Sequence, residues 1–129
     1  MFTRNGIQYE FHHMGVPTRE VRPNERYNAQ FGFYTSDSDC GLVHIQWHRF
    51  DADSCLDPLL RTLPHPAFKV SDLTAALAGH TVLLGPYEPI EGFRVAIIVD
   101  GGMPIELLET TLTDEEIWSR AKSHASLSA

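Results

Sequence analysis

The alternation of apolar and polar residues predicts a chain made mainly of β-strands. Short apolar runs of strand length, separated by turn residues, occupy residues 9–16, 31–36, 42–50, 64–70, 81–87, 92–99 and 103–110. Aspartate and glycine cluster at 37–41 and 100–102, and each cluster predicts a hairpin between its flanking runs. The pattern therefore favours sheets joined by tight turns.

Two segments carry helix signals instead. The stretch SDLTAALAGH begins with Ser71 and Asp72 as capping residues, places apolar residues at helical spacing and ends near Gly79. The run Thr113-Asp114-Glu115-Glu116 spells a capping box, which predicts a C-terminal helix over 113–125. Residues 17–30 contain two prolines and no helical stripe, so at most a turn of helix is expected there.

The chain repeats itself at a fixed shift of 60 positions. The matching pairs are Gly32-Phe33 with Gly92-Phe93, Gly41 with Gly101, and Ile45-Gln46 with Ile105-Glu106. The second half is predicted to contain a strand, a helix and three strands. The first half is predicted to be the same unit with its helix eroded, because it is eight residues shorter before its hairpin, about two helical turns.

The predicted fold class is α+β, with two βαβββ modules that form curled mixed sheets around a trough. The first module covers about 9–50 and has its helix shortened or lost. A linker at 51–63 leads to the second module, about 64–110, and the whole chain of residues 1–129 is expected to be one domain.

The charge and residue composition of the chain limits the kinds of molecule that it is expected to bind. The formal net charge is −7, with 10 Lys and Arg against 17 Asp and Glu, which argues against nucleic acid and anionic membranes. The chain lacks a run of about 18 apolar residues and an apolar N-terminal signal, so a soluble, cytoplasmic protein is expected. Cys40 and Cys55 fit a reducing compartment better than a disulfide framework, although a bond between them stays open.

Equivalent positions in the two halves carry residues that can bind a metal ion. HHMGV at 12–16 aligns with PHPAF at 64–68, so His13 falls on His65, while Gln46 falls on Glu106. All four residues lie on predicted strands, and two curled sheets could bring them into one trough. Two imidazoles, a carboxylate and an amide oxygen suit a divalent transition ion with open positions for substrate.

Strand alternation selects among the other histidines. His12 competes with His13, but only one of two neighbouring residues can face inward, and only His13 aligns with His65. On the strand at 42–50 the polar face is formed by Leu42, His44, Gln46 and His48.

Over roughly residues 9–110 the chain resembles the vicinal oxygen chelate superfamily. The resemblance is carried by the motifs HxGV, IQW, HPAFKVSDL and LLGPYEPIEGFRVAIIVDGGMPIELLE. Members of this superfamily, also known as the glyoxalase and bleomycin-resistance fold, generally take one metal ligand from the first and last strand of each module. The resemblance thus implies the ligands His13, Gln46, His65 and Glu106. This set is most similar to that of the methylmalonyl-CoA epimerases.

The resemblance implies a metal-dependent isomerase, epimerase or lyase for a small carbonyl or carboxylate metabolite. Such an enzyme stabilises an enolate or oxyanion at the metal. Glu106 is the expected catalytic base as well as a ligand. Further candidates for proton transfer or substrate contact are His44, His48 and Tyr34.

Two alternatives use the same scaffold. One is a non-catalytic protein that binds a small molecule, as the resistance members do. The other is an extradiol-type dioxygenase, because His13, His65 and Glu106 also resemble a two-histidine, one-carboxylate triad. The expected cofactor is a divalent ion, namely Zn, Ni, Co, Mn or Fe. The exposed sheet edges favour a homodimer.

Overall fold

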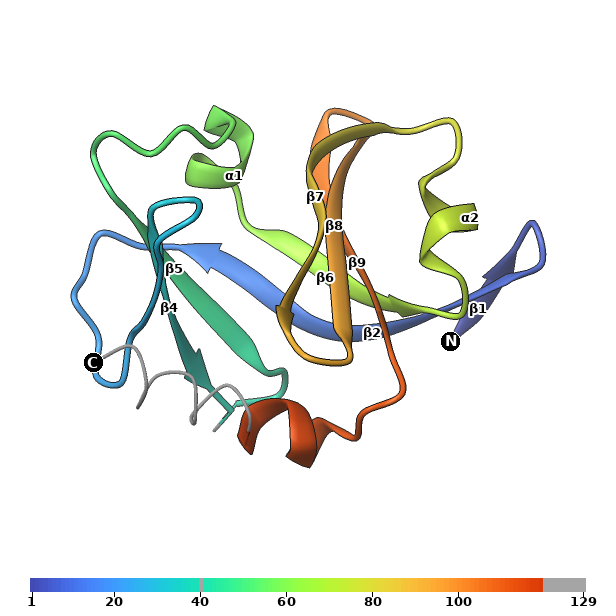
Figure 1. Ribbon diagram of the computed structural model, residues 1–129, viewed down its shortest axis with the longest axis horizontal. Helices are drawn as coiled ribbons and strands as arrows, with labels where there is room; N and C mark the ends of the chain where they lie inside the picture. The colour runs from blue at the N-terminus through green and yellow to red at the C-terminus, as the bar shows by residue number, and fades with distance from the viewer. Residues whose placement is uncertain (40, 120–129) are drawn as a thin grey trace.

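A curled mixed sheet of nine strands forms the frame of the protein (Figure 1). The computed structural model describes residues 1–39 and 41–119. The strands are β1 (Phe2–Arg4), β2 (Ile7–Pro17), β3 (Arg26–Asn28), β4 (Phe33–Ser38), β5 (Ile45–Phe50), β6 (His65–Val70), β7 (Thr81–Ile90), β8 (Phe93–Asp100) and β9 (Met103–Thr110). The helices are α1 (Pro58–Thr62) and α2 (Leu73–Leu77), and a further helix is described over 114–119. This architecture confirms the predicted α+β class.

The two halves of the sheet have the same strand order when each half is read from its own outer edge. The full order runs β3-β4-β5-β2-β6-β9-β8-β7, with β1 paired to β2 outside this path. In each half the first strand runs parallel to the last, β2 beside β5 and β6 beside β9. The halves join through the antiparallel pair β2 and β6. The two predicted modules are therefore present and are related by an approximate two-fold axis.

The strand registers agree with the alignment of the two halves. Gly15 on β2 lies opposite Gln46 on β5, and Ala67 on β6 lies opposite Glu106 on β9. Paired residues on neighbouring strands point to the same face of a sheet. The equivalent residues Gln46 and Glu106 therefore occupy equivalent places in three dimensions.

A loop covers the outer face of the first module, where the second module carries α2. None of residues 18–25 is helical, which confirms that the first module has lost its helix. The guanidinium of Arg22 lies 4.5 Å from the ring centroid of Trp47 on β5. Arg49 pairs with both carboxylate oxygens of Glu25, at 2.8 and 2.9 Å. Two arginine contacts thus replace helix packing.

Three short elements differ from the sequence-based expectation. Strand β3 lies in the segment 17–30, where at most a turn of helix was expected, and it pairs with β4. An N-terminal hairpin joins β1 to β2 through Asn5 and Gly6, whose φ angles of 53° and 76° suit a two-residue turn. Helix α1 lies inside the predicted linker at 51–63, where no helix was expected. Asp57 caps this helix and Pro58 occupies its first turn. Pro58 is typical of a turn in sequence, but a proline also fits the first turn of a helix.

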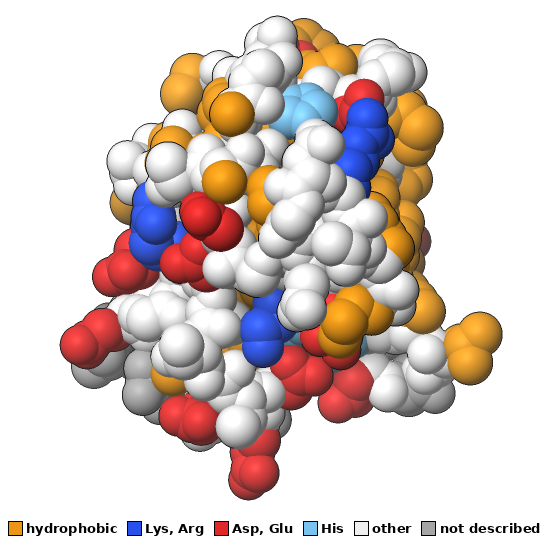
Figure 2. Space-filling view, turned by 90° about the vertical axis from the view of Figure 1, so that its right-hand side faces the viewer, with side chains coloured by type: hydrophobic (Ala, Val, Ile, Leu, Met, Phe, Trp, Pro, Cys, Tyr) orange, Lys and Arg blue, Asp and Glu red, His pale blue; other side chains and the backbone are white. Residues whose placement is uncertain are grey.

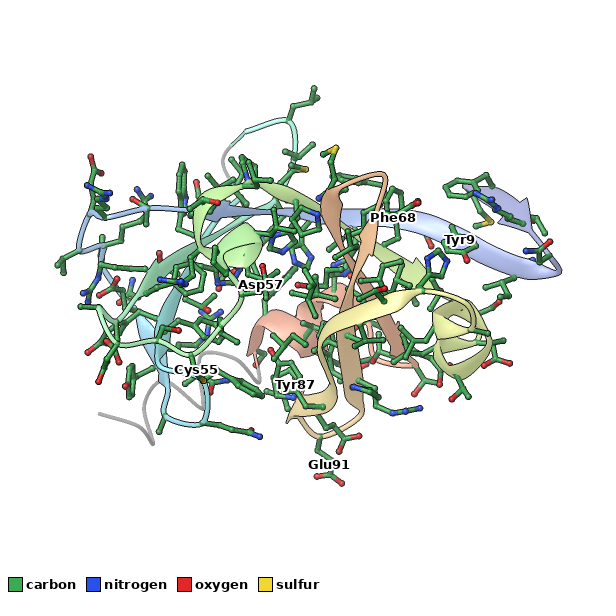
Figure 3. The ribbon with its side chains drawn as sticks, turned by 90° about the horizontal axis from the view of Figure 1, so that it is seen from above. Tyr9, Cys55, Asp57, Phe68, Tyr87 and Glu91 are labelled. Carbon is green, nitrogen blue, oxygen red and sulfur yellow. The ribbon has the colours of Figure 1, made fainter. Side chains whose placement is uncertain are left out.

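Helix α2 covers the outer face of the second module. Its Leu73 is fully buried and packs in one cluster with Leu107 of β9. Tyr9 and Phe68 project from β2 and β6 against the same cluster (Figure 3). Asp72 caps the helix by accepting a hydrogen bond from the backbone N–H of Ala75. The prediction for SDLTAALAGH is thereby confirmed.

Two other helices close the trough on the inner side of the sheet. Leu60 of α1 packs with Leu84 and Ile97 of the second module. The helix over 114–119 places Ile117 against Leu108, in a separate cluster. The two helices lie at opposite ends of the molecule, at the top and bottom of Figure 1. The predicted capping box is present, because Thr113 and Glu116 exchange hydrogen bonds; the prediction for 120–125 lies outside the described residues.

The face around β1 and α2 mixes apolar and charged side chains (Figure 2). Acidic groups gather along its lower edge, and basic groups lie singly. A phosphate backbone requires a continuous basic surface, which this face does not offer.

Within residues 1–39 and 41–119, no helix has the length and apolar character needed to cross a membrane. Cys55 is a free, exposed thiol, and Cys40 lies outside the described residues.

Replacing Leu73 by alanine tests the packing of α2. The Leu73→Ala variant leaves a cavity under the helix, and the free energy of unfolding is expected to fall by about 2–5 kcal/mol. Urea titration measures this change. Leu42→Ala is the control, because Leu42 is 103% exposed and its loss should change stability by less than about 0.5 kcal/mol. Equal effects of the two substitutions would contradict the packing described here.

Candidate functional site

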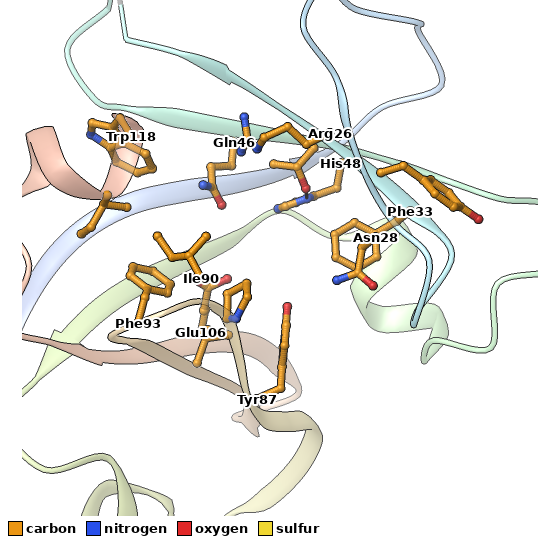
Figure 4. A pocket seen from close by; sticks show the side chains of 15 residues that line it. Arg26, Asn28, Phe33, Gln46, His48, Tyr87, Ile90, Phe93, Glu106 and Trp118 are labelled. Carbon is orange, nitrogen blue, oxygen red and sulfur yellow. Dashed lines mark hydrogen bonds between the residues drawn. The ribbon is translucent and has the colours of Figure 1, made fainter. Parts of the chain in front are cut away.

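A pocket with a volume of about 180 Å³ lies on the inner side of the sheet, between the two halves (Figure 4). Its polar lining comes from Arg26, Tyr27, Asn28, Thr35, Gln46, His48, Tyr87 and Glu106. Its apolar lining comes from Phe33, Pro89, Ile90, Phe93, Val95, Ile117 and Trp118. Both halves and the C-terminal helix therefore contribute to one pocket, which is partly open to solvent.

Glu106 lies between two buried imidazoles. His13 Nε2 is 3.3 Å from one carboxylate oxygen of Glu106, and His65 Nε2 is 3.5 Å from the other. The side chains of His13, His65 and Glu106 are 0%, 3% and 9% exposed. Gln46 lines the same pocket as Glu106 and reaches toward it from β5 (Figure 4). The sequence-predicted residues thus come from the four central strands to one region.

Three of the four imidazole nitrogens of His13 and His65 lack hydrogen-bond partners. His13 Nε2 and both ring nitrogens of His65 are buried and make no hydrogen bond. A buried polar nitrogen without a partner costs about 1–3 kcal/mol, so such atoms call for an explanation. A missing ligand between the imidazoles and the carboxylate would provide one.

The donor set fits a divalent cation, although its atoms must still converge. As they stand, no three or more His, Cys, Asp and Glu side chains within residues 1–39 and 41–119 could hold a metal ion. Two ligands of one Zn²⁺ ion, each at about 2.1 Å, lie about 3.0–3.4 Å apart. The contacts of 3.3 and 3.5 Å between His nitrogens and Glu106 oxygens are close to this separation. Glu106 and each imidazole therefore have about the separation that two ligands of one ion require.

The histidines keep Glu106 ionised. Burial alone would raise the pKa of this carboxyl group, but the contacts and charges of His13 and His65 outweigh it and hold the pKa below its usual value. Glu106 is therefore a carboxylate near neutral pH. A carboxylate can bind a cation or accept a proton.

Gly15 gives the ring of His65 its room. A Cβ atom at position 15 would lie 2.4 Å from Nε2 and Cε1 of the His65 ring. No unusual backbone angle is involved, because the space is occupied by the imidazole of the residue opposite on β6. The glycine in the motif HMGV therefore serves the site directly.

His12 is also directed inward, contrary to the prediction from strand alternation. Its side chain is 7% exposed, and its Nδ1 atom lies 2.8 Å from Nδ1 of His13. A bulge shifts the pairing of β2 with β6 between Phe11 and His13, so that the alternation is interrupted there. His12 Nε2 lies 2.9 Å from an oxygen of Asp114, which comes from the C-terminal helix. Burial and the nearby His13 lower the pKa of His12.

Two of the further candidates lie away from the pocket. His44 precedes β5, so the predicted strand at 42–50 is too long by three residues. Its Nε2 atom lies 2.8 Å from Asp37, and its ring stacks on Trp118 with a centroid distance of 3.9 Å. Tyr34 faces outward on β4, beneath the guanidinium of Arg49 at 4.1 Å. Both side chains have structural contacts where substrate contacts were predicted.

His48 is the further candidate that lines the pocket. It is buried, its Nδ1 atom lies 3.0 Å from the Thr35 hydroxyl, and its ring is nearly parallel to that of His65. Burial and the nearby His65 lower the pKa of His48 to about 3. The ring is therefore neutral near pH 7 and is a weak base.

Tyr87 and Trp118 are among the lining residues that were not assigned a catalytic or ligand role from the sequence. Tyr87 reaches the pocket from β7 (Figure 4), and burial, assisted by Glu106, raises its pKa. Its hydroxyl is therefore a neutral hydrogen-bond donor. Trp118 lines the pocket from the C-terminal helix. Nothing in the local pattern indicates which distant strand this helix contacts.

Comparisons with known proteins support the fold. No family model and no curated protein matches the sequence. The solved structure of methylmalonyl-CoA epimerase from Mycobacterium tuberculosis matches with a TM-score of 0.59 and 19% identity, over 85% of this chain and 91% of that chain. A hypothetical protein from Bacillus halodurans matches with a TM-score of 0.62 and 14% identity, over 81% and 96%. The chain therefore shares the fold of these two proteins. At these identities the likeness concerns the fold alone.

A methyl group at position 15 tests the packing of His65. The Gly15→Ala variant should displace the imidazole and lower the free energy of unfolding by about 1–3 kcal/mol. The control is Gly41→Ala, because a Cβ atom there meets nothing within 4 Å. Chemical denaturation of both variants measures the difference. A neutral Gly15→Ala substitution would show that the ring does not occupy this space.

The low pKa of His48 predicts a pH dependence of stability. As the pH falls below 6.5, the unfolded chain protonates His48 while the folded chain resists until about 3, so the free energy of unfolding falls over this range. The contribution is at most about 1.4 kcal/mol per pH unit. In His48→Leu, which copies Leu108 of the second module, the decline between about pH 6.5 and 5 should be smaller. Identical pH profiles of variant and parent would refute this origin.

Proposed function

We propose that this protein is a cation-dependent isomerase, epimerase or lyase for a small carbonyl or carboxylate metabolite. The observation that carries the proposal is the ionised, buried Glu106 between two imidazole nitrogens that lack hydrogen-bond partners. The fold shared with methylmalonyl-CoA epimerase supports it, since that protein is an epimerase.

The proposed cation ligands are His13, Gln46, His65 and Glu106. The two imidazoles and the carboxylate are the preferred ligands of zinc and of neighbouring transition metals, and the Gln46 amide oxygen suits a harder ion. When bound, the cation would polarise a substrate carbonyl and stabilise negative charge on its oxygen. The chemistry of the donor set leaves Zn, Ni, Co, Mn and Fe as candidates.

Glu106 is the proposed base. Its carboxylate accepts the proton from the carbon beside the substrate carbonyl and returns it to the opposite face or to another atom. The proton count is unchanged in an isomerisation or epimerisation. Tyr87, whose raised pKa keeps its hydroxyl protonated, can donate a hydrogen bond to the substrate.

The pocket favours a small substrate with an apolar side. A volume of about 180 Å³ compares with about 30 Å³ for one water molecule in the liquid, so a metabolite of several heavy atoms fits. Ile90 and Phe93 form an apolar wall beside Glu106 and exclude water from the reacting atoms (Figure 4). A larger substrate must leave part of itself outside.

The predicted homodimer belongs to the same proposal. Strand β7 is an edge of the sheet over ten residues and exposes Val82. An unpaired edge of this length favours pairing with a second copy. Sedimentation equilibrium would measure the molecular mass in solution.

Elemental analysis tests the cation site. Protein purified without added metal or chelator should contain near-stoichiometric divalent metal, and His65→Ala and Glu106→Ala should lose most of it. The controls are His80→Ala and Glu20→Ala, because both residues are exposed and neither lines the pocket. Unchanged metal content in both site variants would rule out these ligands. A parent protein without metal that still binds small carboxylates would favour the non-catalytic binding protein, and iron with ring-cleaving activity the dioxygenase.

A further inference from the structure

A chain of three side chains connects the protein surface to the candidate cation site. Asp114 is 73% exposed, and its carboxylate lies 2.9 Å from Nε2 of His12. The Nδ1 atoms of His12 and His13 lie 2.8 Å apart. The Nε2 atom of His13 then faces Glu106 without a hydrogen bond. The links are short enough for each pair to share one proton.

The chemistry of these groups decides where each proton lies. An ionised carboxylate only accepts hydrogen bonds, so Asp114 requires the proton on Nε2 of His12. A neutral His12 then presents a lone pair at Nδ1, and the short contact requires Nδ1 of His13 to donate. A neutral His13 with its proton on Nδ1 has a lone pair on Nε2. That lone pair is directed at Glu106.

A lone pair that faces a carboxylate is unfavourable unless a positive charge, either a proton or a cation, lies between them. We propose that His12 and Asp114 are positioning residues, which fix the tautomer of His13 so that its Nε2 atom is ready to bind a cation. This inference rests on the proposed function. Neither residue contacts the cation in this arrangement.

The capping interaction of the C-terminal helix does not account for Asp114. The capping box uses Thr113 and Glu116, whose side chains and backbone N–H groups bond to each other. Asp114 is therefore left to accept from His12. Trp118 from the same helix packs near His12, with a centroid distance of 5.5 Å, and holds the helix over the pair.

The second module has no equivalent of this chain. The residue that corresponds to His12 is Pro64, which has no polar side chain. Nδ1 of His65 accordingly lacks a hydrogen-bond partner. The two halves thus supply one histidine with a fixed tautomer and one without. The bulge in β2, which is specific to the first module's strand, makes this difference, since it directs His12 inward.

Nitrogen-15 NMR of the imidazole rings in cation-free protein tests the tautomer. At about pH 8, where an ordinary histidine is neutral, the ring proton of His13 is expected on Nδ1. In His12→Phe the acceptor is lost, and the proton should move to Nε2 beside Glu106. A parent protein in which His13 carries its proton only on Nε2 would overturn the inference. This measurement does not depend on activity or on a bound cation.

Cation affinity provides the second readout. Titration with Co²⁺ should give an affinity about 10–100-fold weaker in Asp114→Ala than in the parent, as is typical when a group behind a metal-binding histidine is removed. Asp114 is exposed, so its loss does not threaten the core. Glu115→Ala is the matched control, because it removes the same charge from the next residue of the helix and should keep the parent affinity.

The outcomes separate the two proposals. Parent affinity in Asp114→Ala, or an equal loss in Glu115→Ala, would refute a specific role for Asp114. If the parent protein binds no Co²⁺, the proposed cation site fails and the positioning role fails with it, even where the NMR result assigns the proton to Nδ1. If the parent binds Co²⁺ and His13 has the wrong tautomer, only the positioning role fails.

Discussion

The antiparallel pairing of β2 with β6 is the constraint on which the rest of the structure depends. Its register places His65 opposite Gly15 and His13 opposite Ala67, so both imidazoles point to the inner face. A slip of one residue would turn both rings to the outer face. Because β5 and β9 flank this pair in equivalent registers, the same constraint directs Gln46 and Glu106 inward. The same strand register therefore determines both the fold and the arrangement of the candidate site.

Burying this many polar groups together has a cost that the fold offsets only in part. His13, His65 and Glu106 attract each other, and this attraction keeps Glu106 ionised despite its burial. Three ring nitrogens nevertheless remain without hydrogen bonds. Buried polar atoms without hydrogen bonds are common at functional sites, where a ligand supplies the missing interaction. The small residues Gly15 and Ala67 leave the space that this cluster needs.

The duplicated sheet is closed by elements that are not duplicated. Helix α1 lies between the modules and fills one end of the trough, while the helix over 114–119 fills the other. The loop at 18–25 takes the place of the lost helix and leaves the inner face unaffected. Asymmetry is thus added around a symmetric centre, and it determines the size of the pocket and the surroundings of His12.

Residue patterns alone determined the repeated strands, the loss of the first helix and the matching of His13 with His65 and of Gln46 with Glu106. These features follow from local alternation and from a constant shift, which the chain carries in one dimension. Tertiary structure alone decided that His12 faces inward, that Tyr34 and His44 do not line the pocket, and that Trp118 does. A bulge and a contact across 102 positions depend on packing between distant segments, and packing of that kind leaves no period in the sequence.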